Sequence, residues 1–216
     1  MSILLSSFYL APIEYYAALF HAEKAFIEVH DNYRKQSYRN RCVIGGANGS
    51  LPLTIPVEKA EKANSQMQDI RIADHGNWQH LHWNAIVSAY NSSPFFPYFE
   101  EDFLLFYEKK IIFLHDFNEQ LRQLLCRLIG IETPVSYTLE YERSPNETSL
   151  IDLREDIDPK KPSSNEIVPY YQVFATKLGF TPNLSIIDLL FNMGTESRIY
   201  LINYPTNQNN QQDCPK

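Results

Sequence analysis

Residues 25–56 read AFIEVHDNYRKQSYRNRCVIGGANGSLPLTIP, and this stretch indicates how the rest of the chain is arranged. Its first part, Ala25 to Val29, is a short apolar run that predicts a buried strand, and the run ends at a polar pair, His30 and Asp31. The later sequence GGANGS contains an Asn-Gly pair, which supplies the positive φ angles of a tight hairpin turn. We therefore expect a core strand that delivers polar side chains at its carboxyl end, followed by a β-hairpin.

The segment between these two elements carries positive charge at alternate positions. It ends with four residues of interest: Tyr38, Arg39, Asn40 and Arg41. If they begin the first hairpin strand, the two arginines project to one face of it. Two guanidinium groups on one face suit a carboxylate or a phosphate, because each can donate two hydrogen bonds in one plane. The structural alternative is a solvated edge strand whose charges discourage pairing with another chain.

Upstream of this stretch, the pattern predicts a strand, a helix and a second strand in close succession. A short apolar strand at Ile3–Ser7 precedes a helix at Ile13–His21, and the core strand follows within a few residues. Such a unit forms a right-handed parallel crossover, and the loops beyond the carboxyl ends of its strands line the ligand crevice. This arrangement places Tyr9 near His30 and Asp31.

The rest of the chain is expected to be mainly helical. Helices are predicted at residues 78–90, 95–106, 116–129 and 184–193, strands at 69–73 and 135–141, and a long polar loop at 143–165. The fold class is therefore α/β (mixed α+β), with a small, mostly parallel sheet opened by a β-α-β unit, a β-hairpin insertion and a helical C-terminal half. We expect a single domain over residues 1–203 and a disordered polar tail at 204–216.

The composition limits the classes of partner. The 216 residues carry a formal net charge of -7, which argues against nucleic acid, because a nucleic-acid-binding face needs clustered Lys and Arg. The start of the chain lacks the basic segment of a signal peptide, and no later stretch is long and apolar enough for membrane insertion. The three cysteines form no paired framework and fit a reducing compartment. A cytoplasmic protein is expected.

The histidines give no recognisable metal site in the sequence. They stand at positions 21, 30, 75, 80, 82 and 115. His80 and His82 are two residues apart on a predicted helix, where side chains at that spacing do not converge on one ion. The chain also lacks a GxSxG nucleophile motif and a phosphate-binding P-loop. We therefore expect neither a metal nor a cofactor, and the sequence leaves the oligomeric state open.

Several segments occur in an order typical of one protein family. They are YLAP at 9–12, AEKAFIEVHDNY at 22–33, SYRNR at 37–41, NGSLPLTIPV at 48–57, NWQHLHW at 77–83, SPFF at 93–96, YQVF at 171–174 and GFTPNLSIIDLLFNMG at 179–194. Together they resemble the WbqC-like family over roughly residues 6–201. The resemblance implies an association with gene clusters for bacterial surface polysaccharide, chiefly O-antigen, and indicates a pathway more directly than a reaction.

The resemblance also implies which positions form the site. The family pattern covers Tyr9, Pro12, Asp31, Tyr38, Asn40, Arg41, His82, Asp188, Asn192, Gly194 and Glu196. The chain departs from it where many members have Gln-Pro before the first Tyr, and at His30, where an acidic residue often precedes the Asp. We expect His82 and Asp31 to be catalytic. The residues expected to bind substrate are Tyr9, His30, Tyr38, Arg39, Asn40, Arg41, Asp188, Asn192 and Glu196.

Three of these residues have a purely structural alternative. Asp31 caps the turn after its strand if its carboxylate accepts hydrogen bonds from nearby backbone amides. His82 is a hydrogen-bonded core histidine if it lies on the buried face of its helix. Asp188 fixes the start of a helix if it forms a capping box with Ser185.

These expectations support two hypotheses about function. In the first, the protein is an acyl, aminoacyl or glycosyl transferase that acts on an activated or lipid-linked sugar. Arg39 and Arg41 would hold a phosphate or carboxylate, and His82, oriented by Asp31, would move a proton. In the second, the protein is a non-catalytic module that binds a nucleotide-linked sugar or another protein of the same pathway. The expected ligand is a small anionic sugar, phosphorylated or nucleotide-linked, and positions 31, 39–41, 82 and 188–196 should meet at one water-accessible hollow.

Overall fold

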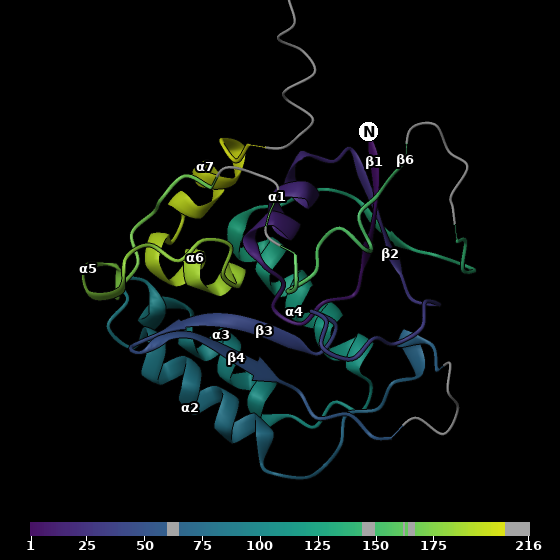
Figure 1. The fold of residues 1–216 in the computed structure, drawn as a ribbon, viewed down its shortest axis with the longest axis horizontal. Helices are drawn as coiled ribbons and strands as arrows, with labels where there is room; N and C mark the ends of the chain where they lie inside the picture. The colour runs from purple at the N-terminus through teal and green to yellow at the C-terminus, as the bar shows by residue number, and fades with distance from the viewer. Residues whose placement is uncertain (60–64, 144–149, 162, 164–166, 206–216) are drawn as a thin grey trace, which may run out of the picture.

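The computed structural model describes residues 1–59, 65–143, 150–161, 163 and 167–205, and a four-stranded sheet forms part of its core (Figure 1). The strands, in the order in which they pair, are β5 (Val135–Tyr137), β2 (Lys24–Glu28), β1 (Ser2–Ser6) and β6 (Leu150–Asp152). All three pairings are parallel. The expected α/β fold with a small parallel sheet is confirmed.

The β-α-β unit at the start of the chain forms as expected. β1 and β2 pair along their whole length, with Ser6 opposite Glu28 at their carboxyl ends, and α1 (Ile13–His21) connects them. Apolar runs such as those of β1 and β2 are typical of strands covered on both faces. The carboxyl ends of the two central strands therefore lie side by side within the protein.

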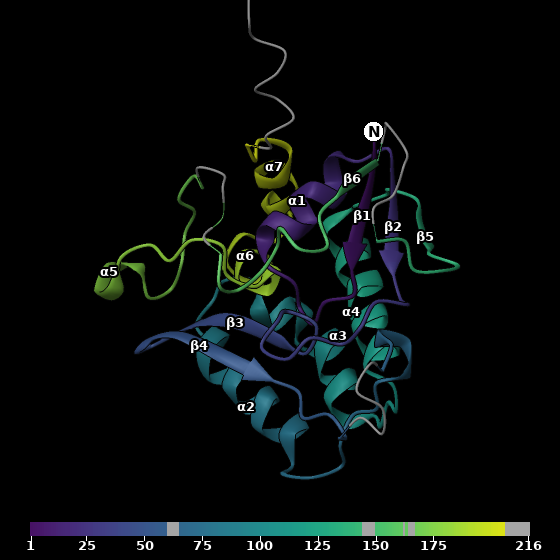
Figure 2. The same cartoon turned by 45° about the vertical axis from the view of Figure 1, so that its right-hand side comes forward.

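The strand order changes direction at β1. From β1 the chain proceeds to β2 and then to β5 on one side of the sheet, whereas β6 pairs with the other side of β1. Figure 2 shows β6, β1 and β2 next to one another. In open parallel sheets, ligands bind beyond the carboxyl ends of the strands at such a change of direction. The segments that follow β1, β2 and β6 are therefore the first place to look for a site.

The predicted hairpin forms a separate two-stranded sheet. Its strands are β3 (Arg41–Gly46) and β4 (Gly49–Thr54), and Gly49 has a φ of 114°, which glycine adopts at low cost. β3 contacts both α2 (Trp78–Tyr90) and α6 (Ile186–Met193) (Figure 1). The hairpin therefore connects the loop that leaves β2 to the helical half of the protein.

The helical C-terminal half is confirmed, and two helices have the bounds expected from the sequence, α1 and α2. The other helices are α3 (Phe96–Glu108), α4 (Leu114–Ile129), α5 (Ala175–Leu178) and α7 (Glu196–Ile202). α4 ends at Gly130, which has a φ of 80° and forms the expected C-terminal cap. α5 and α7 are short and were not expected.

Two strand predictions were wrong in whole or in part. Residues 69–73 form no named strand, because the 3-10 helix η1 (Met67–Asp69) precedes single bridges that join Arg71 to Phe113 and Ile72 to Val57. The strand expected at 135–141 ends at Tyr137, and beyond it Leu139 is 94% exposed. Alternating apolar residues predict a strand only where a neighbouring strand is present to pair with them.

The long loop expected at 143–165 contributes β6 to the sheet, while residues 144–149, 162 and 164–166 lie outside the described residues. Residues 206–216 also lie outside them, so the expectation of a disordered tail is not tested there. Tyr204, at the start of that proposed tail, is buried against Tyr200. Within the described parts of the chain, no helix is long and apolar enough to cross a membrane.

Candidate functional site

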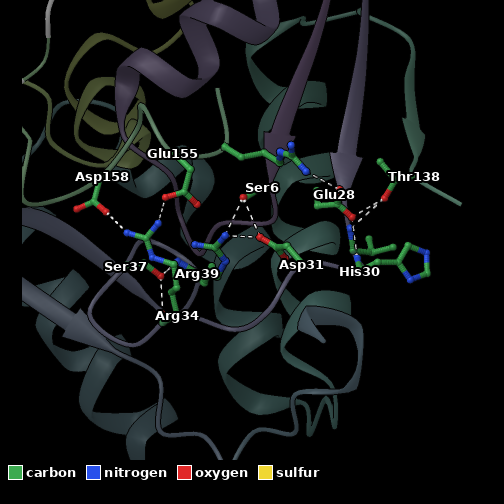
Figure 3. Close-up of polar contacts among 12 residues, drawn as sticks. Ser6, Glu28, His30, Asp31, Arg34, Ser37, Arg39, Thr138, Glu155 and Asp158 are labelled. Carbon is green, nitrogen blue, oxygen red and sulfur yellow. Dashed lines mark hydrogen bonds and ion pairs between the residues drawn. The ribbon is translucent and has the colours of Figure 1, made fainter. Parts of the chain in front are cut away.

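Three polar side chains meet at the carboxyl ends of β1 and β2. Ser6 is the last residue of β1, Asp31 lies three residues beyond β2, and Arg39 follows in the loop that leads to the hairpin. Ser6 Oγ donates to Asp31 Oδ2 at 3.3 Å, and Arg39 Nη2 donates to the same carboxylate oxygen (Figure 3). Arg39 Nη2 also donates to Ser6 Oγ at 3.1 Å. The carboxylate therefore has a charged partner and a neutral one, both on one of its oxygens.

Two asparagines adjoin the backbone of Arg39, and each is held in place by a backbone carbonyl. Asn118 Nδ2, from α4, donates to the backbone oxygen of Arg39 at 2.8 Å. Asn40 Nδ2 donates to the backbone oxygen of Ile55 at 2.7 Å. Because each amide nitrogen donates to a carbonyl, the atom without a hydrogen-bond partner at each asparagine is the side-chain oxygen. We call Ser6, Asp31, Arg39, Asn40 and Asn118 the Asp31 cluster.

The Asp31 cluster is buried but incompletely hydrogen-bonded. Asp31 is 6% exposed and Arg39 is 2% exposed. Within the described part of the chain, six buried side-chain polar atoms have no hydrogen-bond partner, and four of them belong to this cluster: Asp31 Oδ1, Arg39 Nε, Asn40 Oδ1 and Asn118 Oδ1. A buried group without a partner costs about 1–3 kcal/mol, and most such groups in native proteins are satisfied. Four such atoms on neighbouring residues have the capacity to bind ordered water or a ligand.

The electrostatics of Asp31 fit a proton acceptor. Burial raises the pKa of the Asp31 carboxyl above its usual value, while the neighbouring Arg39 guanidinium acts in the opposite direction. A carboxylate with a raised pKa is a stronger base than one at the surface. Its structural alternative, a cap on nearby backbone amides, is not what the structure contains, because Asp31 Oδ2 accepts from two side chains instead.

The loop after β1 is held in an uncommon backbone conformation. Leu10 has a φ of 41°, in the left-handed region that costs a residue with a side chain about 1–2 kcal/mol. Its carbonyl accepts a hydrogen bond from Ser185 Oγ at 2.7 Å, which helps to fix the loop. Strained residues of this kind cluster at functional sites. The strain lies four residues beyond Ser6 and next to Tyr9.

A second arginine holds the loop after β2 against the segment that follows β6. Arg34 forms ion pairs with Glu155 and with Asp158, the latter at 2.8 Å, and its side chain is partly exposed (Figure 3). Ser37 Oγ donates to the backbone oxygen of Arg34 at 2.7 Å within the same loop. These contacts join two segments that leave the carboxyl edge of the sheet, beside the Asp31 cluster.

The expected pair of arginines on one strand face is not formed. β3 begins only at Arg41, and Arg39 lies in a turn before it, so the alternation of a strand does not apply. Arg39 is buried against Asp31, whereas Arg41 is partly exposed and its Nε donates to Thr54 Oγ1 at 3.1 Å. The physical reason is the buried carboxylate of Asp31, which attracts one of the two guanidinium groups into the interior.

His82 belongs to a separate buried set. Tyr9 is fully buried, and its hydroxyl lies 3.0 Å from His82 Nδ1 and 2.8 Å from the hydroxyl of Tyr107. Burial lowers the pKa of His82 to about 4, and a hydrogen bond to the backbone of Thr54 acts in the opposite direction. Because that bond uses a donating ring nitrogen, Nδ1 is left to accept from Tyr9 in the neutral ring. His82 is therefore a neutral, buried histidine that fixes the Tyr9 hydroxyl.

Asp188 is at the centre of a third buried set. Tyr90 donates to its Oδ1 at 2.9 Å, while Tyr170 and Gln172 donate to its Oδ2, the latter at 3.0 Å. Burial raises the pKa of Asp188, and the hydrogen bonds from these donors limit the rise. The capping box with Ser185, the structural alternative for Asp188, is absent, because the carboxylate accepts hydrogen bonds from side chains of other parts of the chain. We call Tyr90, Tyr170, Gln172 and Asp188 the Asp188 cluster.

The remaining predicted site residues lie near the groups around Asp31, His82 and Asp188, and their side chains do not complete any of these groups. Tyr38 is buried, and its backbone oxygen accepts from the backbone of Tyr9 at 2.9 Å. His30 points away from the Asp31 cluster, and its Nδ1 lies 3.4 Å from Gln66 Oε1 (Figure 3). Asn192 Nδ2 donates to the backbone oxygen of Asp188 within α6. Glu196 is exposed in the first turn of α7.

The single water-accessible hollow expected from the sequence is not formed. His82 is 6% exposed and Asp188 is 2% exposed, so both are as buried as Asp31. Among the described residues, no side-chain hydrogen bond links the Asp31 cluster to His82 or to Asp188. Both side chains are buried because tyrosine hydroxyls within the core are their hydrogen-bond partners. Tyr9 is the partner of His82, and Tyr90 and Tyr170 are partners of Asp188. The substrate-binding and catalytic roles of these residues stay predictions.

Several residues of these clusters could not be found from the sequence. Asn118 lies on the helix α4, in which the visible signal was its apolar face, and Tyr90 and Tyr170 had no special pattern. Arg154, after β6, donates to the buried Glu28 at 3.0 Å, and neither was expected to pair. A buried polar residue in an apolar stretch is the one available signal, and it does not identify the partner. No group of three or more His, Cys, Asp or Glu residues in the described ranges could hold a metal ion.

Comparison with known proteins gives one family and one relative. The sequence model of a family described as the WbqC-like protein family matches residues 7–165. A protein of Mycobacterium tuberculosis (strain ATCC 25618 / H37Rv), named "Uncharacterized protein Rv1507c", is 26% identical over 197 residues, which cover 78% of this chain and 83% of that protein. No solved structure matches the chain.

Proposed function

The chain belongs to the WbqC-like protein family, and from the buried chemistry at the carboxyl edge of its sheet we propose that it is a transferase. Its substrate is an activated or lipid-linked sugar of bacterial surface polysaccharide (O-antigen) biosynthesis. The observation that carries the proposal is Asp31 Oδ1, a buried carboxylate oxygen without a partner among the described residues, beside the buried Arg39. Its position after β2, at the edge where parallel sheets bind ligands, supports the assignment.

Asp31 acts as the general base of the transfer. The accepting hydroxyl or amine of the substrate forms a bond to the transferred group, and its proton passes to Asp31 Oδ1. The leaving group departs from the donor with the electron pair of the broken bond. Arg39 holds Asp31 Oδ2, so that the second oxygen is the one presented to the substrate. Acyl, aminoacyl and glycosyl transfer all fit this single proton movement.

His82 supports the site as a positioning residue. Its pKa of about 4 keeps the ring neutral at pH 7, and its Nδ1 lies 3.0 Å from the Tyr9 hydroxyl. Tyr9 lies three residues beyond Ser6, and its backbone is bonded to Tyr38, next to Arg39. A change at His82 therefore reaches the Asp31 cluster through the loop after β1.

The substrate reaches Asp31 when the contacts of Arg34 open. Arg34 joins the loop after β2 to Glu155 and Asp158, and its partly exposed side chain is accessible to water. Glu155 is exposed, so its ion pair with Arg34 contributes only about 0–1 kcal/mol, whereas Asp158 is buried and its ion pair with Arg34 is the stronger of the two. Both ion pairs open during turnover. The same contacts exclude water from the Asp31 cluster when the site is closed.

The test is a product assay with a panel of nucleotide-linked sugars, followed by mass spectrometry. Asp31→Asn should lower the rate by about 10²–10⁴-fold, because general-base catalysis contributes an effect of that size. Glu119→Gln is the matched control, since it disrupts a similarly buried ion pair with Arg122 on α4. The proposal fails if folded Asp31→Asn keeps its activity. Thermal stabilisation by a sugar without any new product would favour a binding module instead.

A further inference from the structure

A groove lies between α3 and α4, in the helical half of the protein. Its volume is about 500 Å³, against about 20 Å³ for the cavity beside Asp188. Ligand sites typically have volumes of about 300–1,000 Å³ and a mainly apolar lining with a few polar groups. The groove therefore has room for a small molecule, and the function proposed above does not use it.

The middle of the groove is apolar. Leu105 and Phe106 line it from α3, Leu124 lines it from α4, and Ile111 lines it from the segment that joins the two helices. Leu105 is 49% exposed, so much of its side chain contacts water. An apolar body in the groove would remove this surface from water, which is favourable.

The two ends of the groove differ in charge. The rings of Phe106 and Phe117 lie 6.3 Å apart, and Arg127 Nη2 lies 3.5 Å from Asp102 Oδ1, so the two helices run in opposite directions. Positive and negative charge are therefore paired at the Asp102 end. At the other end, Lys109 lines the groove and forms no ion pair with any residue that the structure describes. That end carries an uncompensated positive charge.

Gln120 lies at the same end of the groove as Lys109. It precedes Arg127 by seven residues on α4, whereas Lys109 follows Asp102 by seven residues and caps the end of α3. An ammonium group and a side-chain amide both donate hydrogen bonds, so together they suit the oxygens of an acid group. The structural alternative is a solvated lysine that interacts only with the negative end of the α3 dipole.

We propose that the groove between α3 and α4 binds an amphipathic anion, a small molecule with an apolar body and one terminal carboxylate or phosphate. The apolar body lies against Leu105 and Leu124, and the acid group accepts hydrogen bonds from Lys109 and Gln120. Asn118 bonds to the backbone of Arg39 from the other side of α4, because Gln120 is about 200° further around the helix axis. The groove is therefore separate from the Asp31 cluster, and this inference does not depend on the transferase.

The test uses defined probes in NMR titrations of the full chain. The affinity for straight-chain carboxylates should rise about fourfold with each added CH₂ from butanoate to octanoate, because each added CH₂ is removed from water. Octanoate should bind more tightly than octanol, and octanol more tightly than octylammonium, because Lys109 attracts an anion and repels a cation. Octyl phosphate distinguishes the two acid groups: the tighter of octyl phosphate and octanoate identifies the preferred one.

Two variants assign the binding to the groove. Lys109→Gln should lower the affinity for octanoate about fivefold and leave that for octanol unchanged, because only the charge contact is lost. Its control is Lys110→Gln, since Lys110 is also exposed but pairs with Asp74 outside the groove. Leu105→Ser should lower the affinities for octanoate and octanol alike, by about fivefold.

The control for the loss of apolar surface is Leu81→Ser, because Leu81 is 60% exposed on α2 and does not line the groove. It should bind octanoate as the wild type does. The inference is overturned if octanoate does not bind, if inorganic phosphate binds as tightly as octyl phosphate, or if Lys109→Gln retains the full affinity for octanoate. Equal effects of Leu105→Ser and Leu81→Ser would also overturn it. Both leucines are exposed, and circular dichroism establishes that each variant is folded.

Discussion

The Asp31 cluster and the Asp188 cluster are two buried aspartate sites that differ in how completely the carboxylate is hydrogen-bonded. Burial raises the pKa of both carboxyls. Asp188 has no charged partner among its hydrogen bonds, yet both of its oxygens accept from neutral donors. Asp31 has a charged partner, yet one of its oxygens has none.

The difference supplies a testable criterion for distinguishing a structural aspartate from the functional aspartate that we propose. Burial and a raised pKa are common to both, so neither property distinguishes them. Each oxygen of Asp188 has at least one hydrogen-bond donor, whereas Oδ1 of Asp31 has none among the described residues, so Asp31 has the greater remaining capacity to accept a hydrogen bond. A cavity of about 20 Å³ lies beside Asp188, which is room for about one water molecule and not for a sugar.

The largest expected effect tests the ion pair of the Asp31 cluster. Asp31→Asn should lower the free energy of unfolding by about 3–5 kcal/mol, because Arg39 is left buried without a counter-ion. The double variant Asp31→Leu with Arg39→Met should lie within about 1 kcal/mol of the wild type, since both charges are removed together. Urea denaturation measures both. A double variant as unstable as Asp31→Asn would show that the pair holds the fold rather than serves a ligand.

The second effect tests whether the Asp188 cluster contributes to stability without contributing to activity. Asp188→Leu should lower the free energy of unfolding by about 3–4 kcal/mol, because the two tyrosine hydroxyls and Gln172 lose their acceptor. Tyr170→Phe removes only one donor and should cost about 1–2 kcal/mol. Neither change should alter the activity of the folded fraction. A loss of activity beyond the loss of folded protein would place Asp188 in the site after all.

The third effect concerns how the stability of the fold depends on pH through His82. The pKa of His82 is about 4 in the folded protein, against about 6.5 when unfolded. Its stabilising contribution is therefore complete above pH 6.5 and is lost as the pH falls towards 4, because the unfolded chain binds the proton more tightly. The loss should amount to about 3 kcal/mol. His82→Gln should show a flatter stability profile over this range, whereas His80→Gln, at an exposed position of the same helix, should follow the wild type.

The smallest effect tests how tightly β3 packs against the Asp188 cluster. A Cβ on Gly45 would lie 3.1 Å from Asp188 Oδ1 and 3.1 Å from Leu184 Cδ1. Gly45→Ala should therefore cost about 1–2 kcal/mol, since overpacking a buried contact costs at least this much. Ser50→Ala, at the exposed cross-strand partner of Gly45, should cost less than about 0.5 kcal/mol. Equal stabilities of the two variants would mean that the Asp188 cluster tolerates movement.

The elements that were predicted correctly are those whose signal lies within a few residues. α1 and α2 have the expected bounds, because apolar residues at helical spacing specify one buried face. The hairpin turn follows from its Asn-Gly pair. The exit of β2 at a polar pair was also visible, because a buried strand ends where polar residues begin.

The sequence by itself therefore determined the β-α-β opening, the hairpin and the position of Asp31 at the carboxyl edge of the sheet. Only the tertiary structure decided that Arg39 turns inward to Asp31 while Arg41 remains near the surface. It also decided that Asp188 binds Tyr90, which is 98 residues away, rather than the start of its own helix. The physical reason is that burial obliges each polar atom to find a partner, and these partners come from segments that only folding brings together.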